Sequence, residues 1–123
     1  MKVLIIDDDA SMQSLYLRTF QLEGFTAEVA KGGAEGIEKA IASPQPDIIL
    51  LDMMMPTVNG LEVLEKLKAN TSTSNIPVIV MSNYSELNVT TRASELGARY
   101  YIVKSDVEPA NVVETVRTIL GQK

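Results

Sequence analysis

The sequence contains neither cysteine nor histidine among its 123 residues. These two absences exclude a disulfide framework, a thiolate nucleophile, an imidazole base and a zinc site with the usual ligands. Any chemistry must therefore use carboxylates, hydroxyls, lysine and a hard cation that prefers oxygen. A cytoplasmic location suits such a composition best, and we expect it here.

Long hydrophobic runs and excess positive charge are also lacking. No apolar run approaches the ~20 residues that span a bilayer, and no signal-peptide pattern precedes Val3. The net charge of -5 disfavours direct binding to nucleic acid or to an anionic membrane. With 46% hydrophobic and 22% charged residues, the composition is that of a globular chain. We expect residues 1–123 to form one domain.

Five apolar runs alternate with five segments of helical periodicity, which predicts an α/β fold with a parallel sheet covered by helices on both faces. The flavodoxin-like, doubly wound strand order 2-1-3-4-5 is favoured for five strands. The expected strands are Lys2–Ile6, Phe25–Ala30, Ile48–Leu51, Pro77–Met81 and Arg99–Val103. The residues expected to form the inner faces of the first two helices are Met12, Leu15, Tyr16, Thr19 and Phe20, then Ala34, Ile37, Ala40 and Ile41.

Polar side chains follow four of the expected strands. Strand 1 leads into Asp7, Asp8 and Asp9, and strand 3 leads into Asp52. Ser82 follows strand 4 and Lys104 follows strand 5. Asp52 alone could simply open a loop. Because ligands of this fold bind beyond the carboxyl ends of strands 1 and 3, the convergence favours a functional site.

Clustered carboxylates repel one another unless a cation neutralises them. Magnesium fits this role, because it binds one or two carboxylates together with water. With Lys104 as a further positive charge, the cluster is suited to receive a phosphoryl group, and Asp52 is the expected nucleophile.

The chain resembles the receiver domain of a two-component response regulator, and in particular a single-domain regulator of the chemotaxis type. The resemblance rests on five features that span residues 2–121 in the family's order: Ile5-Ile6-Asp7-Asp8, Leu50-Leu51-Asp52, Met55-Pro56 with Asn59-Gly60, Ser82, and Lys104.

The resemblance implies that Asp52 is the phosphoacceptor, with Lys104 and Ser82 bonded to the phosphoryl oxygens. It implies a magnesium site in which Asp8, Asp52 and the backbone carbonyl of Met54 bind the ion directly, with Asp7 in the shell around it. Tyr101 matches the family's aromatic switch residue, whose rotation reshapes the surface of helix 4, strand 5 and helix 5. The protein would be a signalling switch rather than an enzyme. Its expected partners are a sensor histidine kinase or phosphotransfer protein and a downstream protein target, with the chain a monomer or a weak, phosphorylation-dependent dimer.

The sequence departs from the family pattern in two places. Ser105 follows Lys104 where proline is usual, and a cis bond before a residue other than proline costs ~3 kcal/mol, so we expect a trans bond here. Asn83 and Tyr84 follow Ser82 where a small residue is typical, which bears on access to Asp52. We expect these departures to change kinetics rather than identity.

Three alternatives stay open from sequence. A haloacid-dehalogenase-type phosphatase also has a nucleophilic aspartate after a buried strand, but it needs a second aspartate where this chain has Met54. A degenerate receiver would bind partners without phosphorylation. The chain could also be one domain of a larger regulator.

Some residues near the expected site are given structural roles. Asp9 is expected to cap a helix, and Tyr16 and Phe20 to lie in the core. Tyr100 and Tyr101 are expected to point to opposite faces of the sheet.

Overall fold

The computed structural model describes residues 1–53, 60–82 and 87–121, and these residues form a parallel five-stranded sheet of order β2-β1-β3-β4-β5. This confirms the predicted flavodoxin-like fold. The strands are β1 Lys2–Ile6, β2 Thr26–Ala30, β3 Ile48–Asp52, β4 Val78–Ser82 and β5 Tyr100–Val103. The α-helices are α1 Ala10–Leu22, α2 Gly33–Ile41, α3 Gly60–Ala69, α4 Leu87–Glu95 and α5 Pro109–Ile119, and a short 3-10 helix, η1, covers Lys104–Asp106.

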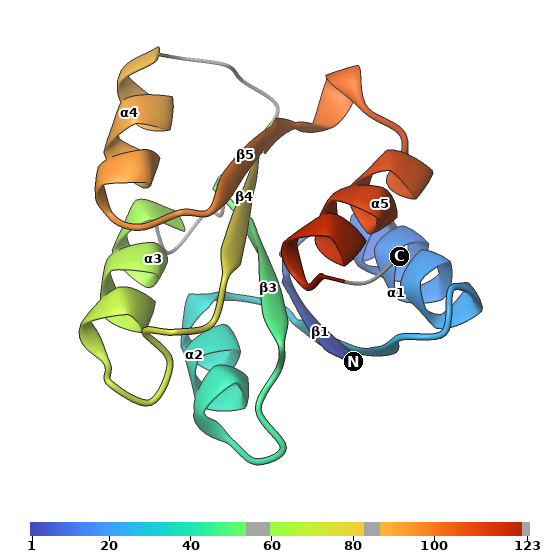
Figure 1. The fold of residues 1–123 in the computed structure, drawn as a ribbon, viewed down its shortest axis with the longest axis horizontal. Helices are drawn as coiled ribbons and strands as arrows, with labels where there is room; N and C mark the ends of the chain where they lie inside the picture. The colour runs from blue at the N-terminus through green and yellow to red at the C-terminus, as the bar shows by residue number, and fades with distance from the viewer. Residues whose placement is uncertain (54–59, 83–86, 122–123) are drawn as a thin grey trace.

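The helices lie in two layers, with α1 and α5 on one face of the sheet and α2, α3 and α4 on the other (Figure 1). Alternate residues of the central strands enter the two cores. In β3, Ile48 and Leu50 pack toward α1 and α5, whereas Ile49 and Leu51 pack toward α2, α3 and α4. Burial on both faces explains why β3 and β4 are almost entirely apolar until their last residues.

The first helix begins where the sequence predicts. The Asp9 carboxylate accepts hydrogen bonds from the backbone N–H groups of Ser11 at 2.8 Å and Met12 at 3.2 Å, so Asp9 is the N-cap of α1. Tyr16 and Phe20 are buried as expected. Leu15, which the periodicity places on the same face, is instead 45% exposed.

The inner face of α2 matches the prediction in part, because Ala40 is buried and Ile37 packs against the core. Ala34 and Ile41 are exposed, and the buried residues are Gly33, Gly36 and Ala40. A β-carbon at Gly36 would lie 2.5 Å from Ile6 Cδ1, so α2 packs against β1 closely enough that a side chain there would displace Ile6. Hydrophobic periodicity cannot detect such a face, because glycine carries no side chain to count.

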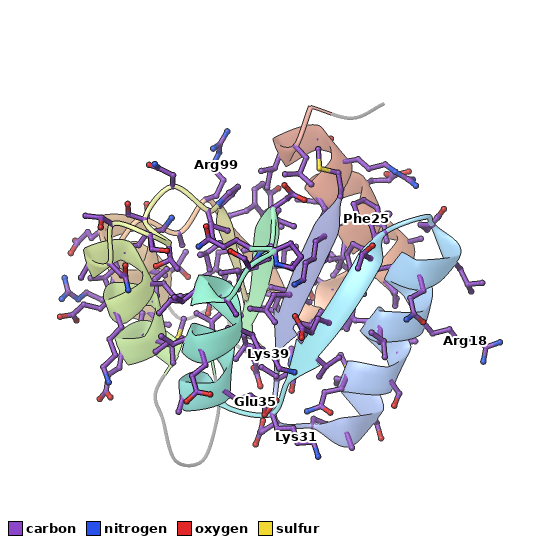
Figure 2. All side chains as sticks on the ribbon, turned by 90° about the horizontal axis from the view of Figure 1, so that it is seen from below. Arg18, Phe25, Lys31, Glu35, Lys39 and Arg99 are labelled. Carbon is purple, nitrogen blue, oxygen red and sulfur yellow. The ribbon has the colours of Figure 1, made fainter. Side chains whose placement is uncertain are left out.

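Charged residues cover the free edge of the sheet at β2. Glu28 forms ion pairs with Lys2 at 3.1 Å and Lys39 at 3.6 Å, and Lys39 also pairs with Glu35 at 3.4 Å. Figure 2 shows Lys39 and Glu35 on α2 beside this strand. Charges along an edge strand discourage pairing with another chain.

Among the residues described, no helix has both the length and the apolar character to cross a membrane.

Candidate functional site

The carboxyl ends of four strands bring the predicted polar residues to one edge of the sheet. Asp7 follows β1, Asp52 and Ser82 are the last residues of β3 and β4, and Lys104 follows β5. Parallel pairing sets Ile6 opposite Leu51, and Asp52 opposite Met81, so these strands end side by side. Asp7, Asp52 and Ser82 are all buried. Buried polar side chains at a strand edge mark this place as the candidate site.

Lys104 joins the acidic residues of the site. Its Nζ lies 3.1 Å from Asp7 Oδ2 and 3.3 Å from Asp52 Oδ1, and its side chain is only 10% exposed. Burial by itself lowers the pKa of the Lys104 ammonium, but the Asp52 and Asp7 carboxylates overcome this effect and leave that pKa raised. The lysine therefore stays protonated at neutral pH and supplies a fixed positive charge between two carboxylates.

Asp7 is held in place by more than this ion pair. Its Oδ1 accepts a hydrogen bond from the backbone N–H of Asp9 at 2.9 Å, and Gln13 Nε2 donates to its backbone oxygen. The next residue, Asp8, is exposed to solvent. The two neighbouring aspartates thus differ, because Asp7 is fixed by the protein and Asp8 is exposed to solvent.

The donor set suits a hard divalent cation. Carboxylate oxygens of Asp7, Asp8 and Asp52 all lie within 4.8 Å of one another. Two ligands of one Mg²⁺ at about 2.1 Å lie at most about 4.2 Å apart, so only a small movement is needed to share an ion. Three carboxylates without thiolate or imidazole match magnesium rather than zinc or copper. The residues present therefore fit the metal that the sequence predicts.

Some of the predictions cannot be assessed in this structure. Met54, Met55, Pro56, Asn59, Asn83 and Tyr84 lie outside the described residues. Ser105 can be assessed: Ser43–Pro44 is the only cis peptide bond found in the described part of the chain, so Lys104 and Ser105 are joined in trans. Lys104 still lies against both carboxylates, and the absence of proline has not removed it from the site.

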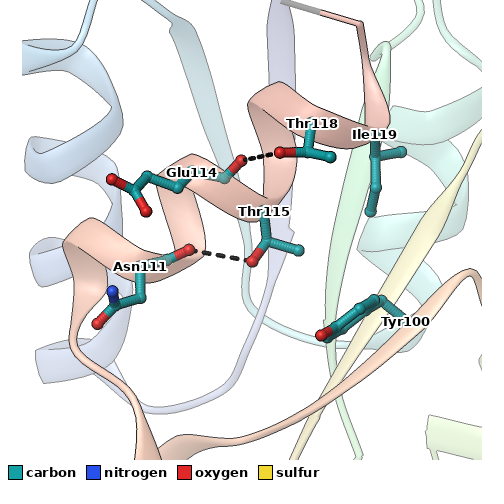
Figure 3. Close-up of a pocket in the computed structure, with 6 residues that line it drawn as sticks. All are labelled: Tyr100, Asn111, Glu114, Thr115, Thr118 and Ile119. Atoms are coloured by element: carbon teal, nitrogen blue, oxygen red, sulfur yellow. Dashed lines mark hydrogen bonds between the residues drawn. The ribbon is translucent and has the colours of Figure 1, made fainter. Parts of the chain in front are cut away.

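The two tyrosines of β5 point to opposite faces of the sheet, as strand alternation predicts. Tyr101 is half-buried and packs on the side of α2, α3 and α4. Tyr100 is 52% exposed and borders an open pocket against α5. Figure 3 shows its ring facing α5, where the Thr115 hydroxyl donates to the Asn111 carbonyl oxygen at 3.0 Å. The pocket is lined by Tyr100, Asn111, Glu114, Thr115, Thr118 and Ile119, none of which belongs to the acidic site.

Sequence reasoning missed two features around the site. Gln13 carries no signal in the sequence, because a polar residue on a helix is ordinarily solvent-facing. Tyr16 lies in the core as predicted, but its electrostatic link to the site was not foreseen. Burial raises the pKa of its hydroxyl, the Lys104 ammonium opposes that shift, and Asp7 reinforces it. The phenol is therefore within electrostatic range of the site.

Comparison with known proteins gives a consistent result. The protein-family model "Response regulator receiver domain" matches residues 3–117. The chain is 34% identical to sporulation initiation phosphotransferase F of Bacillus subtilis, over 84% of this chain and 81% of that protein. It is 32% identical to the response regulator MprA of Mycobacterium ulcerans, over 84% of this chain but only 43% of that longer protein.

Solved structures show the same arrangement. The chemotaxis protein CheY4 of Vibrio cholerae superposes with a TM-score of 0.88 at 25% identity, covering 95% of this chain and 96% of that one. A CheY-like receiver domain protein from Methanospirillum hungatei gives a TM-score of 0.88 at 27% identity, covering 98% and 93% of the two chains. The likeness extends over nearly the whole chain in both cases.

Proposed function

From the premise that this chain belongs to the response regulator receiver domain family, we propose that it is a phosphoryl-acceptor switch of a two-component system, with Asp52 as the acceptor. The observation that carries this proposal is the contact of one largely covered lysine, Lys104, with two buried carboxylates, Asp7 and Asp52. A third carboxylate, that of Asp8, faces solvent beside them.

The proposed reaction moves a phosphoryl group from a phosphohistidine to Asp52. A carboxylate oxygen of Asp52 attacks phosphorus, a P–O bond forms and the P–N bond to the imidazole breaks. The imidazole leaves as a neutral base after taking up a proton, and Asp52 becomes an acyl phosphate. The Lys104 ammonium exchanges its contact with the Asp52 carboxylate for a contact with a phosphoryl oxygen, and the Ser82 hydroxyl donates to another.

Asp7, Asp8 and Asp52 would hold a magnesium ion, together with the backbone carbonyl of Met54. When bound, the ion would neutralise the carboxylates and the phosphoryl oxygens. The chain itself supplies the rest. The strand ends orient the carboxylates, and Lys104 brings a positive charge that is already held at the site before transfer begins.

We infer the finer features of the switch from family membership. The donor would be a sensor histidine kinase or a phosphotransfer protein, and the readout would be a downstream protein that binds the face of α4, β5 and α5.

Because a phosphohistidine is made from ATP, we propose a cytoplasmic location. Residues 1–123 would act as one receiver domain, monomeric or weakly dimeric when phosphorylated. Beyond taking up and losing its own phosphoryl group, the chain would not act as an enzyme.

The proposal is tested by intact-mass measurement after incubation with acetyl phosphate. We expect the wild-type protein to gain one phosphoryl group only when Mg²⁺ is present, and the Asp52→Ala variant to gain none. A mass gain that survives in Asp52→Ala would contradict the assignment. Repeated turnover of a diffusible phosphoester would instead support the phosphatase alternative. No magnesium-dependent change at all would support a receiver that binds partners without phosphorylation.

A further inference from the structure

Gly60, the first residue of α3, lies directly against the end of β3. Its backbone N–H donates to the Met53 carbonyl oxygen at 3.2 Å. A β-carbon on Gly60 would lie 2.6 Å from Met53 Cα and 2.9 Å from the Asp52 carbonyl oxygen. Both are backbone atoms, which cannot turn aside as the tip of a side chain can. Any residue larger than glycine must therefore push α3 and the end of β3 apart.

The backbone that Gly60 contacts carries the proposed acceptor. Met53 is also tied to β4, because its N–H donates to the Met81 carbonyl oxygen at 2.9 Å. The pairing of β3 with β1 ends at Leu51, so the carboxyl end of β3 is held on the β4 side alone. That end bears the Asp52 carboxylate, which lies 3.3 Å from Lys104 Nζ and within 4.8 Å of the other two acidic groups. A shift of the peptide after Asp52 would change these separations directly.

We propose that Gly60 is a positioning residue for Asp52. Because Gly60 has no side chain, the start of α3 packs directly on the end of β3. This contact holds the Asp52 carboxylate next to Lys104 and Asp7. This inference rests on the proposed function of Asp52. It adds a role for a residue that contributes no polar side chain and touches neither the metal nor the phosphoryl group.

Two other glycines provide contrasts. Gly32, the N-cap of α2, has no neighbouring atom within 4 Å of the position that a β-carbon would take. At Gly36, the three atoms nearest to such a β-carbon all belong to the side chain of Ile6. The close approach at Gly60 is therefore not a general property of helix starts in this fold. Gly32→Ala is the matched control, because it also adds one methyl group at the beginning of a helix that follows a β-strand.

The test is a Mg²⁺ titration of ¹⁵N-labelled wild type, Gly60→Ala and Gly32→Ala, followed by amide shifts. We expect the Mg²⁺ affinity of Gly60→Ala to fall about tenfold, as it does when groups that orient metal ligands are altered. Its rate of phosphorylation by acetyl phosphate should fall by a similar factor. Gly32→Ala should stay within about twofold of wild type in both measurements.

Loss of stability is separated from loss of positioning by running the titration at low temperature in sucrose, which favours the folded state. In a separate thermal scan in the same sucrose buffer, the rise in Tm caused by saturating Mg²⁺ is compared between variants. A folded Gly60→Ala protein that binds Mg²⁺ as tightly as wild type would overturn the inference, as would a variant that never folds, because the proposal predicts a local shift. If the wild type itself neither binds Mg²⁺ nor gains a phosphoryl group, the proposed function fails as well.

Discussion

At the scale of single residues, the site is a balance of charge. Three carboxylates share one small region, and one ammonium group, that of Lys104, contacts two of them. The third, Asp8, is exposed. The carboxylates of such a cluster repel one another at this separation, and a bound cation reduces that repulsion. Sequence reasoning could predict the members of the cluster, since strand ends of a parallel sheet must meet. It could not predict that Lys104 would bridge Asp7 and Asp52, because side-chain contacts depend on packing.

The charge balance makes a prediction for Asp8→Asn. Without metal, this variant should be more stable than wild type by on the order of 1 kcal/mol, because one of three repelling carboxylates is gone. With Mg²⁺, the wild type should gain stability and the variant should gain little. Urea unfolding with and without Mg²⁺ measures both effects. A variant that is less stable without metal and still stabilised by Mg²⁺ would show that Asp8 is not part of the site.

Tyr16 predicts the behaviour of the fold in alkali. The unfolded state loses the phenolic proton near pH 10.0, whereas burial raises the pKa of Tyr16 in the folded state and keeps the proton bound. The part of the folding stability that comes from Tyr16 should therefore be fully present below pH 10.0. It should be lost above that pH, by up to ~1.4 kcal/mol per pH unit. Lys68 acts in the opposite sense, because burial and the nearby Arg99 lower its pKa. Comparing wild type with Tyr16→Phe cancels the Lys68 effect, and Tyr16→Phe should lose stability less steeply. Equal slopes would contradict this account of Tyr16.

At the scale of elements, the sequence predicted the number, type and order of helices and strands well, because hydrophobic periodicity reports the buried faces directly. It did less well where close approach, rather than side-chain burial, sets the packing. Helix α2 packs through Gly33, Gly36 and Ala40, and α3 begins at Gly60 against the backbone of β3. Glycine contributes nothing to a hydrophobic pattern, so both contacts became visible only in three dimensions.

The packing of α2 is tested by a double-mutant cycle between Gly36 and Ile6. Gly36→Ala should destabilise the protein by about 1–3 kcal/mol through overpacking, despite alanine's higher helix propensity. Ile6→Val removes Cδ1, the atom closest to the new methyl group, so the double variant should recover part of the loss. Urea unfolding of the four proteins gives the coupling energy. Strict additivity would mean that the two residues do not compete for the same space.

At the scale of the whole molecule, β4 and β5 connect the site to the proposed output surface on α4, β5 and α5. Ser82 and Lys104 lie at the ends of these strands, and Tyr101 lies within β5 on the side of α4. We propose that the signal passes along β5, because this strand joins Lys104 to Tyr101. The pocket beside Tyr100 lies on the α5 side of the same strand (Figure 3). The family resemblance predicts that the face of α4, β5 and α5 responds, and this stays a prediction. The pocket, which arises from the packing of α5 on β5, was not predicted.

We expect beryllofluoride with Mg²⁺, which mimics a bound phosphoryl group, to move amide resonances first around Asp52 and Lys104. The shifts should extend along β5 to Tyr101 and the surrounding α4 and α5 surface, because rearrangement at the strand ends changes packing there. The amides of β2, on the far edge of the sheet, should change little. Shifts confined to the acidic site would contradict a role for Tyr101 in transmitting the signal.

The central claim is that Asp52 receives the phosphoryl group, and locating the modified residue tests it most directly. Borohydride reduces an acyl phosphate to an alcohol, which converts a phosphorylated aspartate into homoserine. After phosphorylation with acetyl phosphate and Mg²⁺, reduction and digestion, mass spectrometry of the peptides should find homoserine at position 52 and at no other aspartate. Homoserine at position 7 or 8, or a phosphorylated protein without homoserine at position 52, would contradict the account.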